Sequence, residues 1–230
     1  MPAVQRQRAV DAIRRHTCQV TYSIVARDPE TGQLGVGVAS RVLAVGALCP
    51  WVEPGVGAVA TQSFVELSYG AKSLAALRDG TAPATVLEEL TGADAGAATR
   101  QVAVIDAQGR IAVHDGSQCV PEAGSVLGEQ FSCQANMMRR SGVPEAMADA
   151  FVTTSGPLAA RILSALDAAE AAGGDFRGRQ SSAVKIVAND PVEGINGLLI
   201  DLRVDDHPEP LSELRRLVDL HATGGWFGSQ

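Results

Sequence analysis

The sequence predicts an α+β fold: a four-layer αββα sandwich in which two antiparallel sheets face each other and helices cover their outer faces. Two observations support this class. Short turns, such as DPETG at 28–32, join apolar runs that are typical of strands, and connections this short form antiparallel hairpins. The apolar runs also lack strict alternation with polar residues, which indicates strands that are covered on both faces. The hairpins exclude a doubly wound parallel sheet.

In the first half of the chain, apolar residues at helical spacing predict helices, and short Val- and Ala-rich runs bounded by Gly, Pro or Asp predict strands. Asp79-Gly80 and Gly92 mark helix ends. The expected order is a helix at 3–16, strands at 20–26, 34–40 and 56–62, and helices at 68–78 and 84–90.

The second half continues with strands, two helices, strands and a closing helix. The turn at 107–109 joins two strands into a hairpin, while Pro157 and Gly173-Gly174 mark the two ends of a long helix. The expected order is strands at 100–106, 110–114 and 130–136, helices at 144–153 and 157–172, strands at 182–188 and 198–204, and a helix at 209–221.

The composition is that of a folded domain with its own core. The chain has 230 residues, of which 46% are hydrophobic and 20% are charged, and this excludes a disordered chain. The net charge of −7 argues against binding to nucleic acid or to an anionic membrane. No apolar run approaches the roughly 20 residues of a membrane helix, and the basic N-terminus lacks the apolar segment of a secretory signal. We therefore expect a cytoplasmic protein with a helical extension at 1–20 and one domain at 21–230.

The cysteines and the short motifs indicate neither a metal nor a cofactor. No zinc-like spacing links the four cysteines, Cys18, Cys49, Cys119 and Cys133, so we expect buried and reduced side chains. The sequence contains no HExxH, GxSxG or P-loop motif. The Gly-x-Gly at 55–57 lacks the third glycine of a dinucleotide-binding loop, so we expect no cofactor.

Several blocks of the sequence resemble one protein family. These blocks are TYSIVARD at 21–28, GVGVASR at 35–41, GAVATQ at 57–62, GGDFRGRQS at 173–181 and DLRVDDH at 201–207. They resemble the DUF1028 family of bacterial proteins, which is grouped with the N-terminal-nucleophile (Ntn) hydrolases. The resemblance runs from about residue 20 to about residue 221. It implies the αββα fold, and it implies little about the substrate.

The resemblance also implies a nucleophile at the start of the first strand, where Thr21 lies. In Ntn hydrolases a Thr, Ser or Cys at a free N-terminus attacks an amide carbonyl, and its own α-amine, with a reference pKa of about 7.7–8.0, acts as the base. Ser40-Arg41, at the end of the second strand, resembles the Ser-Arg pair of the proteasomal site. Thr61-Gln62, between a strand and a helix, resembles the oxyanion-hole loop. From its position alone, Thr21 is better interpreted as an ordinary β-branched strand residue, and the family resemblance makes the nucleophile an equal alternative.

Two origins of the N-terminal extension stay open. Twenty residues precede Thr21, and the residue before it is Val20 rather than the glycine that is common before self-cleaving nucleophiles. Either translation starts at Val20 and removal of the start residue frees Thr21, or the extension is real and blocks the amine. In the second case the chain is a precursor or an inactive member. Cys18 is a rival nucleophile, which is also internal and lies outside the family blocks.

The segment 173–182 is the expected substrate-binding region. Its Gly-rich backbone and two arginines, Arg177 and Arg179, suit a carboxylate or a phosphate, and Asp175 and Gln180 accompany them. We expect one of these arginines at the mouth of a cleft where the predicted catalytic residues converge. The alternative is the C-terminus of a helix with both arginines paired to structural acids.

A further hypothesis is a metal site in which Asp205, Asp206 and His207 bind a divalent cation. The two aspartates would point to opposite faces of a continuing strand, so capping of the last helix by this segment is favoured. Other polar candidates near strand ends are Glu66, Tyr69 and Asn136.

We therefore expect an Ntn-type amidohydrolase that acts on a small amide or a related C–N bond. The expected partners are a small-molecule substrate and further copies of the chain in a homo-oligomer, with no nucleic acid, membrane, cofactor or metal. The alternative is a catalytically inactive protein of the same fold that binds a small metabolite or only assembles. The state of Thr21 separates them, because only a free α-amine supports the enzyme.

Overall fold

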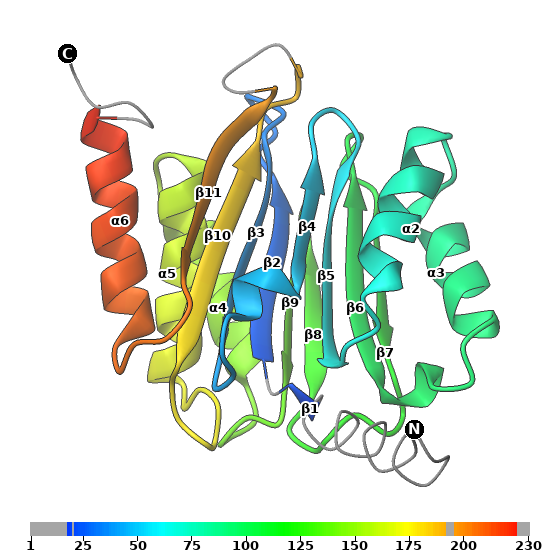
Figure 1. Cartoon of the computed structure of the whole chain (residues 1–230), viewed down its shortest axis with the longest axis horizontal. Coiled ribbons are helices and arrows are strands. Elements are labelled where there is room, and N and C mark those ends of the chain that lie inside the picture. Colours follow the sequence, from blue (N-terminus) through cyan, green and yellow to red (C-terminus); the bar gives the residue numbers. More distant parts are fainter. Residues whose placement is uncertain (1–17, 20, 192–195, 225–230) are drawn as a thin grey trace, which may run out of the picture.

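The computed structural model of the chain describes residues 18–19, 21–191 and 196–224 (Figure 1). Within these residues the strands form two antiparallel sheets, one of six strands and one of five, and five α-helices pack on them. The structure is therefore of the α+β class. The helix expected at 3–16 lies outside the described residues.

The larger sheet contains the strand that begins with Thr21. Its strands are β2 (Thr21–Arg27), β3 (Leu34–Ser40), β8 (Gly124–Gly128), β9 (Phe131–Asn136), β10 (Ser181–Val187) and β11 (Leu198–Val204). They lie in the order β11-β10-β3-β2-β9-β8. The hairpin predicted from the turn at 28–32 is confirmed, with Thr21 opposite Ser40, and so is the antiparallel pairing of β10 with β11.

The smaller sheet is built around β5. Its strands are β1 (Cys18–Gln19), β4 (Pro50–Glu53), β5 (Gly57–Phe64), β6 (Arg100–Asp106) and β7 (Ile111–Asp115). One edge of β5 pairs with β6, and β4 and β1 pair with successive parts of the other edge. The residues just before Thr21 therefore pair with Ser63 and Phe64 at the end of β5.

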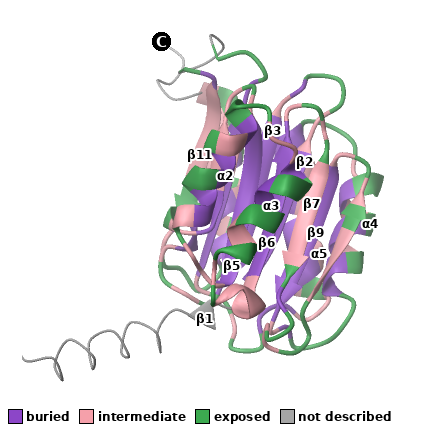
Figure 2. Cartoon of the chain, turned by 90° about the vertical axis from the view of Figure 1, so that its right-hand side faces the viewer, coloured by how far each residue is buried: buried purple, intermediate pink, exposed green. Residues whose placement is uncertain are grey.

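The helices pack on the outer faces of the two sheets (Figures 1 and 2). α4 (Val143–Thr153), α5 (Leu158–Ala171) and α6 (Pro210–Gly224) contact the larger sheet. α2 (Ser68–Arg78) and α3 (Pro83–Gly92) contact the smaller one. None of the described helices is both long enough and apolar enough to cross a bilayer.

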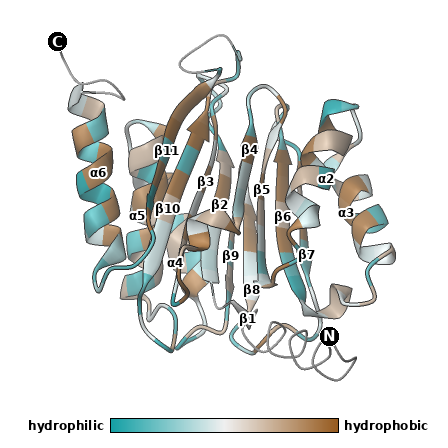
Figure 3. Ribbon diagram, in the orientation of Figure 1, coloured by the Kyte–Doolittle hydropathy of each residue, from teal (hydrophilic) through white to brown (hydrophobic). Residues whose placement is uncertain are grey.

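Apolar side chains fill the space between the sheets and the spaces under the helices. In β2, Ile24 belongs to the cluster under α4, α5 and α6, whereas its neighbour Val25 belongs to the cluster between the sheets. Successive side chains of a strand point to opposite faces, so β2 is buried on both faces and needs no polar alternation. Figure 3 shows this as hydrophobic colour along the central strands and mixed colour along α6.

Three edge strands, β1, β4 and β8, were missed by the sequence prediction. β4 begins with Pro50 and β8 begins with Gly124, and both residue types are more typical of turns than of strands. Proline is compatible with the first position of an edge strand, because no hydrogen bond of the ladder is lost there.

Gly37 of β3 determines how closely α5 approaches the sheet. A Cβ atom at Gly37 would lie 2.3 Å from Cγ2 of Ile162, a branched and fully buried side chain. We expect Gly37→Ala to lower the free energy of unfolding by about 1–3 kcal/mol through overpacking, as measured by urea unfolding. Gly92→Ala is the matched control, because its Cβ would have no neighbour within 4 Å. Equal stabilities for the two variants would contradict this packing.

Candidate active site

Thr21 lies at the start of β2, at the end of the space between the two sheets. It is fully buried, and its hydroxyl donates a hydrogen bond to Ser40 Oγ across the hairpin, with 3.4 Å between the two oxygens. On its other edge Thr21 pairs with Asn136 of β9. The alternation of β2 places Thr21 on the same inner face as Val25, which packs between the sheets. The structure thus brings Thr21 and Ser40 together, as the sequence predicts.

Two side-chain amides hold the backbone of Thr21. Gln62 Nε2 and Asn136 Nδ2 each donate to the carbonyl oxygen of Thr21 at 3.3 Å. Both also donate to Oε1 of Gln101, at 2.7 and 2.9 Å respectively. All three amide side chains are buried. The network joins the two sheets at the candidate nucleophile.

The orientation of the Gln101 amide determines which groups donate and which accept hydrogen bonds in this network. Its Nε2 faces acceptors only, namely the Ala135 carbonyl at 3.0 Å, the Gly124 carbonyl at 3.2 Å and Asp115 Oδ1 at 2.7 Å. Carbonyl and ionised carboxylate oxygens accept hydrogen bonds and do not donate them, so the oxygen of Gln101 must face the other two amides. Those amides must then direct their nitrogens toward the Thr21 carbonyl.

One acceptor beside Thr21 is left over. Within the described part of the chain, Asn136 Oδ1 is buried and has no hydrogen-bond partner. A buried acceptor without a partner is costly, by about 1–3 kcal/mol. This oxygen is therefore available to an N–H group that enters the site.

Thr61 and Gln62 lie within the strand predicted at 56–62, and not in a loop between that strand and the next helix. Both residues lie inside β5, which continues to Phe64. Gln62 shares the inner face with Ala60, whereas Thr61 shares the outer face with Val59, which packs in the cluster under α2 and α3. The backbone N–H of Thr61 also donates to the Cys49 carbonyl at 3.1 Å. The structure therefore brings Gln62 to Thr21 and directs the Thr61 side chain away from it.

Asp175 and Gln180 lie against the end of β3. The buried Asp175 carboxylate accepts a hydrogen bond from the backbone N–H of Arg41 at 3.0 Å and forms an ion pair with Arg177 at 3.1 Å. The backbone N–H of Gln180 donates to the carbonyl of Ser40 at 3.1 Å. Four of the predicted residues are thus joined to the Ser40 end of the hairpin.

Arg179 belongs to a separate chain of polar contacts that joins α5 to the residue before α6. It pairs with Glu170 at 2.5 Å and with Glu209. Glu170 also accepts a hydrogen bond from the Tyr22 hydroxyl at 2.7 Å. Burial, and then the charge of Glu170, raise the pKa of Tyr22 well above its usual value. Arg177 and Arg179 are therefore both paired with carboxylates, which is the alternative that the sequence left open.

The segment 205–207 does not form one cluster of ligands. Asp205 pairs with Arg203 at 3.1 Å, while Asp206 accepts a hydrogen bond from Gln180 Nε2 at 3.0 Å. His207 Nδ1 accepts the backbone N–H of Glu209 at 3.0 Å, just before α6. These separate contacts agree with a capping role for this segment.

Cys49 lies close to the network but is a poor nucleophile. Its Sγ is 3.9 Å from Gln62 Oε1, and complete burial raises the pKa of the thiol to about 12. Burial also raises the pKa of the Cys133 thiol. The rival nucleophile Cys18 has a side chain outside the part of the chain that is described.

A cavity of about 610 Å³ lies at the end of β5, and no residue of the Thr21 network lines it. Phe64 lines it two residues beyond Gln62, which corresponds to about 7 Å along a strand. Glu66, one of the further polar candidates, also lines it, and Arg100 closes one wall through an ion pair with Asp94 at 2.8 Å. Tyr69 lines a separate cavity, and its hydroxyl donates to Asp94 at 3.1 Å.

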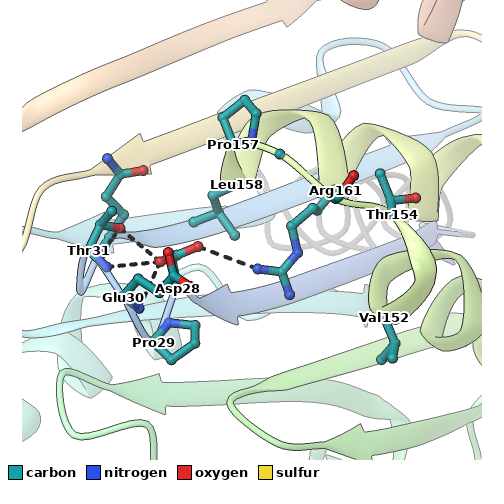
Figure 4. Close-up of a pocket in the computed structure, with 12 residues that line it drawn as sticks. Asp28, Pro29, Glu30, Thr31, Val152, Thr154, Pro157, Leu158 and Arg161 are labelled. Carbon is teal, nitrogen blue, oxygen red and sulfur yellow. Dashed lines mark hydrogen bonds and ion pairs between the residues drawn. The ribbon is translucent and has the colours of Figure 1, made fainter.

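The cavity in Figure 4 lies at the opposite end of β2. It has a volume of about 470 Å³, and Asp28 and Arg161 form an ion pair at 3.4 Å in its wall. Partial burial raises the pKa of Asp28, but hydrogen bonds from Thr31 and Glu30 outweigh it and lower the pKa overall. The length of β2 separates this cavity from Thr21 by about 20 Å.

Gln101 was missed by the sequence analysis, although a signal was present. It lies in a strand whose inner face otherwise carries Ala103 and Ile105, so a glutamine there is a polar residue at a core position. Such a residue needs hydrogen-bond partners in the interior. No motif contains it, and only the opposing sheet shows what those partners are.

Comparison with known proteins identifies the family. A family model described as "Family of unknown function (DUF1028)" matches residues 21–214. The crystal structure of the DUF1028 protein SPO2555 from Silicibacter pomeroyi is 33% identical, covers 90% of this chain and 88% of that chain, and superposes with a TM-score of 0.82.

Two structures of Anbu, an ancestral beta-subunit, are also similar. The protein from Yersinia bercovieri is 13% identical, with coverage of 87% of this chain and 96% of that chain and a TM-score of 0.41. A Gly-1 mutant from Hyphomicrobium sp. strain MC1 is 14% identical, with coverage of 91% and 99% and a TM-score of 0.38. Among curated proteins no match was found. The family model spans most of the sequence and begins at Thr21, so the chain belongs to the DUF1028 family, a family of unknown function.

Proposed function

We propose that this protein is an Ntn-type amidohydrolase that acts on a small amide or a related C–N bond, with Thr21 as the nucleophile. The observation that carries the proposal is the buried constellation around Thr21: a hydroxyl bound to Ser40, and a carbonyl held by Gln62 and Asn136. The two facing sheets with helices on both outer faces fit the four-layer αββα sandwich of such enzymes.

The chemistry requires that the nitrogen of Thr21 be a free amine. Thr21 Oγ then attacks the amide carbon while its proton moves to that amine, and the leaving nitrogen takes the proton as the C–N bond breaks. Water hydrolyses the resulting ester and restores the hydroxyl. The unpartnered Asn136 Oδ1 is suited to accept an N–H from the freed amine or from the substrate.

The cavity at the end of β5 supports a small substrate. Its volume of about 610 Å³ lies within the range of about 300–1,000 Å³ found for small-molecule sites. Its lining residue Phe64 lies two positions beyond Gln62 in β5, and Gln62 contacts Thr21 directly.

A specific observation favours the second candidate, a binding protein without catalysis. Thr21 is completely buried, and its nitrogen is part of the peptide bond to Val20 in the full sequence. An amide nitrogen cannot accept the hydroxyl proton. The enzyme therefore requires removal of residues 1–20, whereas the binding protein does not.

Covalent labelling tests the proposal. A chain that begins at Thr21 is treated with a β-lactone, which acylates nucleophilic hydroxyls, and the modified peptide is mapped by mass spectrometry. We expect one acyl group on Thr21 and none in Thr21→Ala. Thr153→Ala, at the exposed end of α4, is the matched control and should be labelled like the wild type. Labelling at another residue, or none in a folded sample, would refute Thr21 as the nucleophile.

A further inference from the structure

Most cations of the described chain pair with a carboxylate, and a few do not. The arginines and lysines without an ion pair among the described residues are Arg27, Arg41, Lys72, Arg139 and Arg140. Two of them, Arg41 and Arg139, lie against the same loop, 173–180, beside the Thr21 end of the larger sheet. Unpaired positive charge is therefore concentrated near the candidate active site.

Arg41 is held in place by neutral groups. Its Nη1 donates to Gln180 Oε1 at 2.5 Å, and Gln180 Nε2 donates to Asp206 Oδ1 at 3.0 Å. Because the Asp206 carboxylate accepts and does not donate, Gln180 must turn its oxygen toward Arg41. The guanidinium group of Arg41 is thus oriented without being neutralised.

Arg139 is held on the same loop in a similar way. Its backbone N–H donates to the Gly174 carbonyl at 3.0 Å, and its Nη2 donates to the Phe176 carbonyl at 3.2 Å. Both partners are carbonyl oxygens, so this arginine also keeps its charge. Arg139 is exposed, as is Arg41.

Both arginines follow residues that contact Thr21. Arg41 comes directly after Ser40, which accepts the Thr21 hydroxyl, and Arg139 comes three residues after Asn136, which donates to the Thr21 carbonyl. The backbone of both arginines is therefore close in sequence to residues that contact Thr21, and both guanidinium groups donate to the loop 173–180.

The other charged groups of this region are already paired or lie further along the surface. Arg177 is paired with Asp175, and Arg179 is paired with Glu170 and Glu209. Arg140 lines a separate cavity of about 170 Å³ whose wall also contains Glu122 and Glu145. These charges leave Arg41 and Arg139 as the groups that are open to an external anion.

We propose that Arg41, assisted by Arg139, binds the carboxylate of an anionic substrate, so that the molecule presented to Thr21 is an amide that also carries an acid group. This assignment rests on the proposed function for its link to Thr21, but anion binding itself does not require catalysis. A guanidinium group binds a carboxylate through two parallel hydrogen bonds, which are stronger than neutral ones. Because Gln180 fixes Arg41 beforehand, little conformational freedom is lost on binding.

Calorimetric titration of the full-length chain tests this assignment, with succinate, inorganic phosphate and uncharged succinamide as probes. We expect succinate to bind about tenfold or more tightly than succinamide, and Arg41→Gln to remove this preference. Arg139→Gln should weaken succinate binding by a smaller factor. Arg216→Gln, an exposed arginine paired with Glu213 on α6, is the matched control and should bind like the wild type.

Each outcome of the titration decides one point. Unchanged succinate binding in a folded Arg41→Gln variant, checked by circular dichroism, would overturn the assignment, as would equal binding of succinate and succinamide by the wild type. If phosphate binds more tightly than succinate and this binding depends on Arg41, then the group that Arg41 recognises is a phosphate and not a carboxylate. Succinate binding is measured without any reaction at Thr21, so a failed labelling experiment and a failed anion site are distinguishable.

Discussion

A chain that begins at Thr21 is expected to react at Thr21 about 10²–10⁴ times faster than the full-length chain, because this is the usual contribution of a general base. In the full sequence the nitrogen of Thr21 is a peptide amide and cannot take the hydroxyl proton. Thr21 is also fully buried, and strand β1, just before it, pairs with Ser63 and Phe64. Expression as Met-Thr21 allows removal of the initiator, and the rate of β-lactone acylation is the measurement.

A chain that begins at position 18 and carries Cys18→Ala, so that no N-terminal thiol competes for the reagent, is the matched control for this experiment. It lacks residues 1–17 but keeps β1 and the peptide bond before Thr21, so it should react as slowly as the full-length chain. Intact mass confirms each N-terminus. Equal rates for all three chains would contradict the dependence on a free amine. Fast acylation of the chain that begins at position 18 would show that removal of residues 1–17 is sufficient for the reaction.

The second large effect is expected for Gln101→Glu. This substitution keeps the shape of the side chain but replaces the donor Nε2 by an acceptor oxygen. The new carboxylate would face Asp115 and two backbone carbonyls where the nitrogen now donates. An uncompensated charge in the interior costs about 3–5 kcal/mol. We expect a loss of this size in the free energy of unfolding at pH 7.5, together with loss of Thr21 acylation in the shortened chain.

The pH dependence of this variant has a definite sign. Burial and the nearby Asp115 raise the pKa of the introduced carboxyl group above its value in the unfolded chain. The folded state then binds the proton more tightly, so the deficit is largest above the raised pKa and shrinks as the pH falls through it. Gln108→Glu, on the exposed turn between β6 and β7, is the matched control and should stay within about 0.5 kcal/mol of the wild type. Equal losses at both positions would show that Gln101 does not face only acceptors.

The sequence predicted the hairpin of β2 and β3 and the meeting of Thr21 with Ser40, because both follow from local spacing. The turn at 28–32 fixes the register, and the register places Thr21 opposite Ser40. Gln62 was identified through the family resemblance, and the strand predicted at 56–62 already contained it together with Thr61. The apolar run that predicts β5 ends near Gln62, whereas pairing with β1 and β6 extends the strand to Phe64.

Contacts between the two sheets could not be predicted from local sequence patterns. Gln101 and Asn136 belong to different sheets, and nothing within either strand indicates that their amides meet at Thr21. The partners of Arg41 likewise lie more than a hundred positions away in the sequence, at Asp175 and Gln180. Such contacts depend on the global packing of the fold, which residue spacing does not encode.

The double pairing of β2 has a consequence for how residues 1–20 can be removed. An endoprotease binds several residues on both sides of the bond that it cuts, in an extended and unpaired conformation. The residues after the Val20–Thr21 bond are paired with β3 on one edge and with β9 on the other, and both faces are buried. Cleavage of this bond by a foreign endoprotease therefore needs the larger sheet to open, at a cost close to that of global unfolding. Proteolytic maturation of the folded chain must instead proceed by stepwise trimming from the N-terminus or by attack from within the molecule.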